Sequence, residues 1–426
     1  MNIPQTWTLT QLGNLTAQIV GGGTPSKTSA ANFNGHIPFM TVKDLKARFV
    51  NTTVDHISEE ALQSSATTKV PADTLIVATR MSLGKIARPT MDVAINQDLK
   101  ALFLHGGVNK TFVEYFWRSK SQAIQSMGTG TTVKGIRLED IRSLEVPLAP
   151  VAEQKRIADK LDTVLTRVDA VNTRLARVAP LLKRFRQSVL AAATSGRLTE
   201  DWRGGRAVNE TWRVIPLGKY VENHDGARVP ISETLRTERR GAYPYYGASG
   251  VIDTIDGFTH EGKFVLIGED GANLVTRSKP IAFIATGKIW VNNHAHVLKC
   301  KEGASDEYLA YYINSIDLTP YVSGSAQPKL NQKNLNTIPV PVPPTEEQTE
   351  IVRRVETLFA FADRLEARLA QAQTAATRLT PALLAKAFRG ELVPQDPNDE
   401  PAAELLRRLA SSPTAPAKRG RAAKAT

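Results

Sequence analysis

The sequence contains a single cysteine, Cys300, among its 426 residues. One thiol excludes an internal disulfide framework and any zinc site built from cysteines. The apolar neighbours Val297 and Leu298 favour an ordinary buried thiol. The first residues lack the basic start and apolar core of a signal peptide, and no run of about 18 uncharged apolar residues occurs. We therefore expect a cytoplasmic protein that does not bind a membrane.

Motifs of common enzyme classes are also missing. The glycine-rich stretches 21–23 and 128–135 do not end in the Gly-Lys-Ser/Thr of a P-loop, so we interpret them as turns. There is no nucleophile elbow, no zinc-protease helix and no Asn-Pro-Pro-aromatic run of the kind that adenine methyltransferases use. His294 and His296 alternate as in a strand without a third ligand nearby, so we expect no metal site. These absences lower the odds of an enzyme without excluding one.

Acidic residues are outnumbered, since 54 Lys and Arg stand against 42 Asp and Glu and give a net charge of +12. This excess favours a polyanionic partner, because Lys and Arg gain affinity by displacing counterions from phosphates. Nucleic acid is the leading candidate. The alternatives are charge that serves solubility, or a contribution from the basic tail alone.

One segment of the sequence occurs twice at a constant offset. The stretch VPLAPVAEQKRI near residue 147 returns as VPVPPTEEQTEI near residue 341, and the offset of 194 positions holds without insertion as far as Leu198 and Leu392. Apolar residues in both copies recur at alternating steps of four and three, which predicts long helices over residues 151–198 and 345–392. We expect the helices to pair as an intramolecular antiparallel coiled coil, because a narrow apolar stripe needs a partner. The expected seam contains Ile157, Leu161, Val164, Val168, Val171 and Leu175 in the first helix and Ile351, Val355, Leu358, Leu365 and Leu369 in the second.

A globular segment of mixed pattern precedes each helix, and the two segments begin alike, with Trp7 corresponding to Trp212. Short strand-like runs alternate with turn residues and one longer helical run, which predicts two α+β domains related by a pseudo-two-fold repeat. We place the first domain at residues 1–150, and a connector and the second domain at 199–344. We expect the C-terminal extension 393–426 to be largely disordered apart from a short helix at 402–410.

Several loops combine basic side chains with polar ones able to read base edges, namely 21–27, 79–85 and 128–134 in the first domain. They contribute Thr24 and Lys27 as candidate DNA contacts. The second domain offers tyrosines 243, 245 and 246, then Arg277, then Asn292 and Asn293. The alternative for the tyrosines is a half-buried place in a sheet.

The most specific stretches of the repeat are EQKRIADKLD and FRQSVLAAATSGRLTEDWR in the first copy and EEQTEIVRRVETLF and LLAKAFRGELVP in the second. Together with IPFMTVKDL, AINQDLKAL and YPYYGASGVID, they make the chain resemble the specificity subunit of a type I restriction-modification system. The resemblance covers nearly the whole sequence. It implies two target-recognition domains that each read half of a split DNA sequence, and two helices that hold them apart.

The same resemblance implies a non-catalytic subunit that docks two modification (methyltransferase) subunits and the restriction (translocase/endonuclease) subunits. The cofactors S-adenosylmethionine, ATP and Mg²⁺ would belong to those partners, and this chain would bind none. The segments that resemble recognition loops add further candidates for DNA contact. These are Thr79, Arg80, Ser82, Lys85, Asn96, Gln97 and Lys134 in the first domain, and Tyr245, Tyr246, Asn292, Asn293, Gln327 and Lys329 in the second.

Two alternatives remain open from the sequence. The run 96–98 is either a contact or a structural turn. The chain as a whole is either a DNA reader, a self-sufficient enzyme with an unrecognised site, or a coiled-coil scaffold whose globular ends bind proteins. Because the helices share one phase while the domains differ in length and loops, we expect an asymmetric DNA target.

Overall fold

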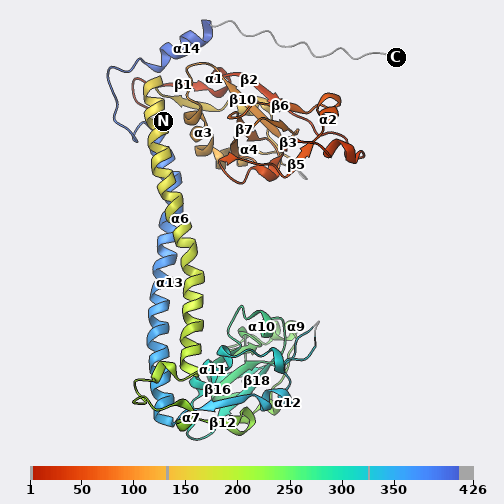
Figure 1. Ribbon diagram of the computed structural model, residues 1–426, viewed down its shortest axis with the longest axis vertical. Helices are drawn as coiled ribbons and strands as arrows, with labels where there is room; N and C mark the ends of the chain where they lie inside the picture. Colours follow the sequence, from red (N-terminus) through yellow and green to blue (C-terminus); the bar gives the residue numbers. More distant parts are fainter. Residues whose placement is uncertain (1–2, 131–133, 325–326, 412–426) are drawn as a thin grey trace. The chain divides into compact units, whose positions relative to one another are not determined.

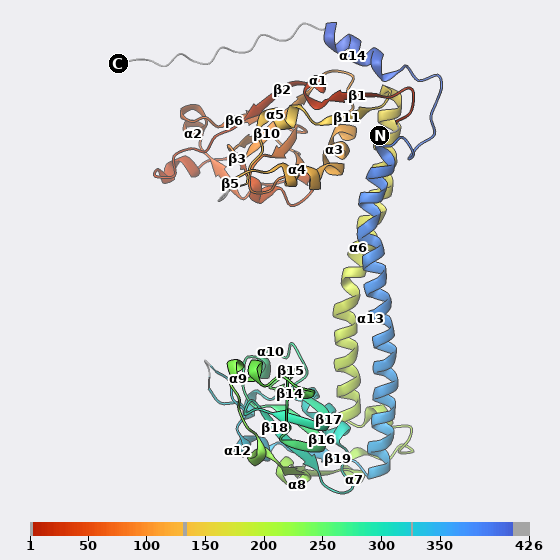
Figure 2. The ribbon, with the colours of Figure 1, turned by 180° about the vertical axis from the view of Figure 1, so that it is seen from behind.

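A computed structural model describes residues 3–130, 134–324 and 327–411 (Figure 1). The chain divides into two compact units, the first formed by residues 1–174 and 373–426 and the second by residues 175–372. Each unit contains one α+β domain and a part of each long helix (Figure 2). The predicted fold class, two α+β domains and two long helices in a repeat, is therefore confirmed.

The domain of the first unit is built on two sheets. The larger sheet has the strand order β2-β10-β7-β8-β4 and the smaller one β5-β3-β9-β6, while β1 pairs with β11 alone. Every residue of the central strand β7 is buried, as its continuous apolar sequence LIVA requires. The strands are β1 (Thr8–Gln11), β2 (Thr16–Gly21), β3 (Ile37–Met40), β4 (Phe49–Val50), β5 (Asp55–Ile57), β6 (Thr68–Val70), β7 (Leu75–Ala78), β8 (Ile86–Pro89), β9 (Val93–Ile95), β10 (Leu99–Leu104) and β11 (Glu145–Leu148). The α-helices of this domain are α1 (Leu12–Leu15), α2 (Glu59–Ser64), α3 (Lys110–Ser119), α4 (Ser121–Met127) and α5 (Leu138–Arg142).

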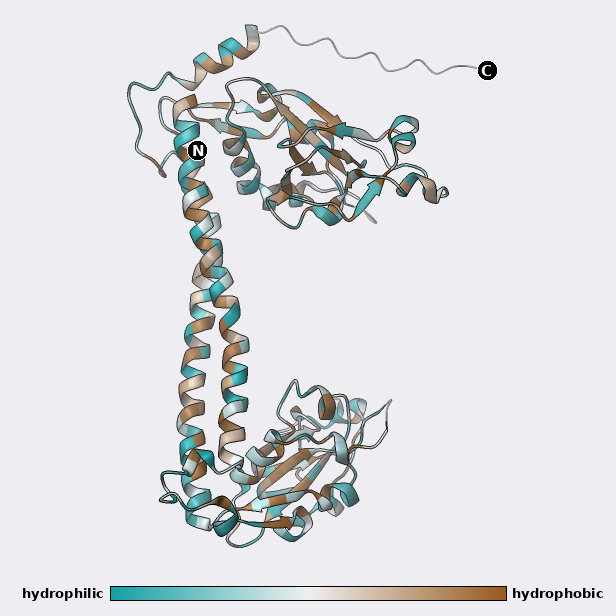
Figure 3. Cartoon of the chain, in the orientation of Figure 1, coloured by the Kyte–Doolittle hydropathy of each residue, from teal (hydrophilic) through white to brown (hydrophobic). Residues whose placement is uncertain are grey.

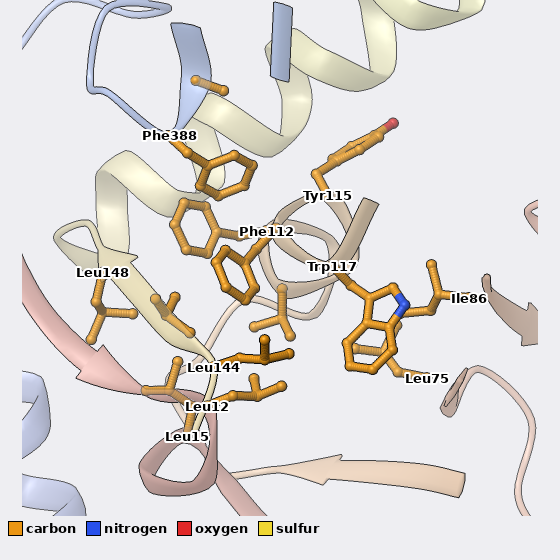
Figure 4. Packing of buried hydrophobic residues seen from close by; sticks show 14 of the residues in the cluster. Leu12, Leu15, Leu75, Ile86, Phe112, Tyr115, Trp117, Leu144, Leu148 and Phe388 are labelled. Atoms are coloured by element: carbon orange, nitrogen blue, oxygen red, sulfur yellow. The ribbon is translucent and has the colours of Figure 1, made fainter. Parts of the chain in front are cut away.

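The core of the first unit forms around α3, which buries Phe112 and Trp117 (Figure 4) and also Phe116. The aromatic ring of Phe388, which directly follows the second long helix, lies 5.1 Å from that of Phe112 and 5.7 Å from that of Phe116. Tilted and edge-on rings at such distances are favourable beyond the area that they bury. The C-terminal part of the chain therefore completes the core of the N-terminal domain.

The second domain has one six-stranded sheet with the order β13-β18-β16-β17-β14-β15, and β12 pairs with β19 alone. Apolar residues line these strands, as the brown segments of Figure 3 show. The strands are β12 (Arg213–Pro216), β13 (Val221–Asn223), β14 (Tyr243–Gly247), β15 (Gly250–Ile255), β16 (His260–Gly268), β17 (Ala282–Val291), β18 (Ala295–Cys300) and β19 (Pro339–Val342). The helices are α7 (Val208–Thr211), α8 (Leu217–Tyr220), α9 (Glu233–Glu238), α10 (Asn273–Thr276), α11 (Asp306–Ser315) and α12 (Gln332–Thr337).

The two long helices are α6 (Val151–Thr194) and α13 (Thr345–Ala387). They begin at the predicted residues and end just before Gly196 and Gly390, whose φ values of +78° and +76° stop a helix at little cost. In the first unit the start of α6 packs with the end of α13, and in the second unit the end of α6 packs with the start of α13. The helices therefore pair antiparallel within each unit, as predicted.

The seam between the helices departs from a strict heptad at some positions. Ile157, Leu161, Ile351 and Val355 are fully buried as predicted. Val171, however, is 44% exposed, so its predicted place in the seam is wrong. The departure is local, because Leu182 and Val189, further along the same helix, are buried again. Val164, Leu175, Leu358 and Leu365 are half-buried, while Val168 and Leu369 are buried.

The duplicated Glu-Gln pair fastens each domain to the first turn of its helix. Gln154 accepts a hydrogen bond from the backbone amide of Asn109 at 2.9 Å, and Gln348 accepts one from that of Ser305 at 2.8 Å. Both glutamines donate to the backbone a few residues before their helix, to Ala149 and to residue 343 respectively. Gln154 and Gln348, which correspond in the repeat, therefore anchor the two domains by the same hydrogen bonds.

The C-terminal extension contains the predicted short helix but differs from the prediction of disorder over residues 393–401. Asp399 pairs with Arg156 at 2.5 Å, and the backbone amide of Ala402 donates to the carbonyl of Thr6 at 2.9 Å. Helix α14 (Ala402–Ser411) then buries Leu405 against the first domain. The amphipathic sequence of this helix gains an apolar surface only when the domain has folded. Residues 412–426 lie outside the described part of the chain.

Candidate nucleic-acid interface

In the first unit, four strands of the larger sheet start or finish at one edge. The register pairs Gly21 with Lys100, Ala78 with Leu99 and Val77 with Ile86, so β2 and β7 end where β10 and β8 begin. The loops that leave this edge are joined by backbone hydrogen bonds. The amide of Thr79 donates to the carbonyl of Asp98 at 2.8 Å, and the amide of Ile136 donates to that of Thr79 at 3.0 Å. We call residues 22–27, 79–85, 96–98, 128–130 and 134–136 the first loop edge.

The first loop edge brings most of the predicted contact residues of this domain together. Thr24 donates a hydrogen bond to Gln97 at 2.5 Å, which joins two loops that are far apart in the sequence. Arg80 forms an isolated β-bridge with Gly135. Ser82 is half-buried, and the predicted residues that are exposed on these loops are Lys27, Arg80, Lys85, Gln97 and Lys134.

Two predicted contacts in this domain are instead structural. Thr79 is 4% exposed, and its hydroxyl donates to the carbonyl of Asp98. Asn96 is 6% exposed, donates to the carboxylate of Asp98 at 2.9 Å and accepts from its backbone amide. This is the local side-chain-to-backbone turn that Asn favours. The structural alternative for Asn96 is therefore correct, whereas Gln97 beside it is exposed.

The second unit repeats this frame with different side chains. The backbone amide of Glu269 donates to the carbonyl of His294 at 2.9 Å, and the amide of Leu330 donates to that of Glu269 at 2.7 Å. Asp270 and Lys329 form an isolated β-bridge, as Arg80 and Gly135 do in the first unit. The positions match by the repeat, since 136 and 330 differ by the same 194 residues. We call residues 269–277, 292–294, 323–324 and 327–330 the second loop edge.

Predicted contact residues of the second domain fall into two groups. Asn293, Gln327 and Lys329 are exposed on the second loop edge, and Lys329 lies 3.2 Å from the carboxylate of Glu269. Asn292 is buried and accepts from the backbone amide of His294, which makes it the counterpart of Asn96.

The side chains of Arg277, Tyr245 and Tyr246 also make contacts within the domain. The Arg277 guanidinium donates to the carbonyls of Ile313 and Ile316 at the end of α11, and burial lowers its pKa. Tyr245 is 1% exposed and accepts from the backbone amide of Ile231, while the half-buried Tyr246 stacks on Phe283. The alternative that the tyrosines are sheet residues is therefore correct for these two.

A buried charged network supports the second loop edge, and the sequence did not reveal it. His296 is 1% exposed, and its two ring nitrogens face the carboxylate of Asp225 at 2.6 Å and the carbonyl of Leu330 at 2.7 Å. Arg228 contacts Glu269 at 2.6 Å. Burial raises the pKa of Asp225, but His296, the backbone amide of Val297 and Arg228 together outweigh it, so the pKa is lowered. The alternation of His294 and His296 was the visible signal of this network in the sequence.

A basic groove of about 880 Å³ in the first unit continues from Lys85. Its apolar lining residues include Leu165, Leu384 and Phe388. Three of its cations are paired with carboxylates, because Arg48 and Arg118 both contact the buried Glu114 and Arg389 contacts Glu391. The cations that line the groove are Lys46, Arg48, Lys85, Arg118, Lys120 and Arg389.

Among residues 3–130, 134–324 and 327–411, no three His, Cys, Asp or Glu side chains are grouped so that they could hold a metal ion. The helices of this same part of the chain include none that is long and apolar enough to span a membrane. Cys300, the one thiol, is half-buried, and burial raises its pKa.

Comparison with known proteins gives a consistent result. The chain is 27% identical over 423 residues to the type I restriction enzyme EcoDI specificity subunit of Escherichia coli, and 28% identical over 427 residues to the StySPI specificity subunit of Salmonella potsdam. Each comparison covers 92% of this chain and 90% of the relative.

Solved structures share the fold. A chain from work on complex assembly and conformational transition of the type I R-M system aligns with a TM-score of 0.72 at 19% identity, covering 92% of this chain and all of that one. The HsdS subunit from Thermoanaerobacter tengcongensis aligns with a TM-score of 0.59 at 18% identity, covering 92% of this chain and 99% of that one. The model of the type I restriction modification DNA specificity domain matches residues 4–179 and 209–373, once for each half of the repeat. This chain therefore belongs to the type I restriction-modification DNA specificity family.

Proposed function

We propose that this chain is the DNA-recognition subunit of a type I restriction-modification complex and reads a bipartite, asymmetric target in double-stranded DNA. The observation that carries the proposal is the pair of loop edges, which share one backbone frame but differ in side chains. Where the first edge has the exposed Arg80, the second has the half-buried Asp270, whose carboxylate contacts His294 at 2.7 Å. Family membership supports the general role, and the frame supports two readers.

The chemistry of the two edges favours different half-sites. A guanidinium such as that of Arg80 pairs with the acceptors of guanine, whereas Asp270, held by His294, offers no such donor at the matching position of the second edge. Exposed amides, Gln97 on the first edge and Asn293 on the second, suit adenine. Because the cations and carboxylates are distributed differently, the same sequence cannot satisfy both edges equally well.

We further propose that the chain is not itself catalytic. It would dock two modification subunits, which use S-adenosylmethionine, and restriction subunits, which use ATP and Mg²⁺, while binding none of these cofactors. The relatives are named as specificity subunits of restriction enzymes, which supports this division of labour. The modification subunits would methylate adenine after it leaves the base stack, a step that a distorted duplex assists.

The test is target recognition by the complex of this chain with its modification subunits. Methylome sequencing of a host with and without the gene gives the split target, and binding of that target is then compared with binding of random duplex. Arg80→Ala should weaken binding about 5- to 150-fold and relax selectivity at a base of one half-site only. Arg407→Ala, at an exposed position of α14, is the matched control and should leave binding unchanged. Equal binding of every duplex by the unaltered complex would rule the proposal out.

A further inference from the structure

Met81 in the first unit and Gly271 in the second occupy the same position of the shared frame. The backbone amide of Met81 donates to the carbonyl of Lys134 at 3.2 Å, and that of Gly271 donates to the carbonyl of residue 328 at 3.0 Å. The acceptors correspond by the repeat, since 134 and 328 again differ by 194. Each residue directly follows the member of its loop that forms the isolated β-bridge.

Both positions require a left-handed backbone, with φ of +61° at Met81 and +100° at Gly271. Glycine adopts this region freely, whereas a residue with a long side chain is strained there by about 1–3 kcal/mol. The second unit therefore uses the residue that suits the backbone. The first unit uses one that does not.

The fold does not explain why the first unit keeps a methionine. Two other non-glycine residues of the described chain have positive φ, and polar contacts hold both of them. Asp73 binds Lys110 at 2.6 Å, and Arg277 donates to the end of α11. Met81 is instead 68% exposed, so its apolar side chain gains little from packing. Strain that packing does not offset points to a role in binding.

The surroundings of Met81 indicate what it binds. Arg80 precedes it, and the exposed Lys134 lies across the hydrogen bond that holds it, so an apolar side chain projects from a basic surface. The loop is held in place by further backbone bonds, from Ser82 to Arg80 at 2.6 Å and from Lys85 to Ser82 at 3.2 Å. Cations that grip phosphates around an apolar wedge such as Met are the means by which proteins unstack a DNA base step.

We propose that Met81 is a wedge that the first loop edge inserts between two stacked base pairs, while the second edge, with Gly271, leaves its half-site stacked. This inference rests on the proposed DNA recognition. The distortion would be confined to one half-site, at a flexible step such as a pyrimidine followed by a purine. Selectivity at that step would then arise without a hydrogen bond to either base.

The test compares Met81→Gly, Met81→Leu and the unaltered chain, each in the complex with its modification subunits. The target duplex carries 2-aminopurine at successive steps of each half-site, away from the adenines that become methylated. For the unaltered chain, we expect a fluorescence increase at one step of the first half-site only. Met81→Gly should abolish that increase and weaken binding about tenfold, whereas Met81→Leu should keep most of both.

A folding measurement separates this role from a structural one. Glycine accepts the backbone of position 81, so Met81→Gly should leave the thermal unfolding midpoint unchanged or raise it. A reciprocal variant, Gly271→Met, should create a new fluorescence signal in the second half-site if its loop tolerates the strain.

The outcomes also distinguish the two proposals. If the unaltered complex binds its target selectively but Met81→Gly binds equally well and gives the same fluorescence, the wedge is overturned and DNA recognition stands. If the unaltered complex prefers no split target, the proposed function itself fails.

Discussion

Trp212 donates a hydrogen bond from its indole nitrogen to the carboxylate of Glu347, 2.9 Å away. Trp7 makes the same bond to Glu153 at 2.8 Å in the first unit. The two anchors differ in the second group that the buried carboxylate contacts. Glu347 contacts the guanidinium of Arg203 at 2.5 Å, whereas Glu153 accepts from the neutral amide of Gln395 at 2.6 Å, and burial raises the pKa of Glu153.

This difference predicts unequal sensitivity of the two anchors to neutralisation. Glu347→Gln leaves the charge of Arg203, which is 4% exposed, buried without its partner, and should cost about 3–5 kcal/mol in the free energy of unfolding. Glu153→Gln, the matched variant, should cost only about 1 kcal/mol because no buried cation loses its partner. Denaturant unfolding of the two variants measures both values. Equal losses would contradict the assignment of charge.

The buried network of the second unit predicts a dependence of stability on acid. The pKa of Asp225 is lower in the folded chain than in the unfolded chain, where it is about 3.9. Folding therefore favours the charged carboxylate. Stability from this group is therefore fully present above that pKa and is lost as the pH falls through the lower folded pKa. The pKa of Glu269 is lowered too, by Arg228 against the opposing effect of burial, and acts in the same direction.

Asp225→Asn should accordingly destabilise the chain at neutral pH and flatten the loss of stability below about pH 4. Unfolding midpoints measured between neutral and acid pH test this expectation. Asp256→Asn removes a carboxylate that pairs with Arg239 on the surface, and should change neither quantity much. An unchanged acid profile in Asp225→Asn would show that the network is not the source.

Lys85 belongs both to the first loop edge and to the basic groove, and we expect it to contact phosphate rather than bases. Lys85→Ala should weaken the binding of all duplexes by a similar factor and reduce the slope of log affinity against log salt by about one. Lys301→Ala is the control, because this exposed lysine follows β18 at the end opposite the second loop edge. A selective loss for one target sequence would assign Lys85 to base reading instead.

The corrected seam predicts that two residues of α6 differ in their tolerance of charge. Leu161→Asp places an unpaired carboxylate in a fully buried site and should cost about 4 kcal/mol or more. Val171→Asp lies at a position that is 44% exposed and should change stability by no more than about 0.5 kcal/mol. Thermal unfolding followed by circular dichroism compares them. A large loss of stability in Val171→Asp would instead show that Val171 lies in the seam, as a strict heptad requires.

Much of the fold follows from local pattern. The steps of four and three predict both long helices, because the period of the apolar residues belongs to each helix by itself. The pairing follows because each apolar stripe must be buried against a partner. The short strand-like runs likewise become strands such as β3 and β10. The exposure of Val171 and the docking of residues 393–411 were not predictable, since they depend on the facing surfaces, which exist only after folding.

The candidate sites divide in the same way. The pattern of polar and basic residues identifies the loop that carries the exposed Arg80, and the family resemblance adds the exposed Gln97 and Lys329. It does not separate Asn96 from Gln97, since which of two adjacent amides closes the turn depends on the backbone around them. The equivalence of Met81 and Gly271 is likewise a product of tertiary structure. Hydrogen bonds across more than 50 residues create it, and no local similarity of sequence records it.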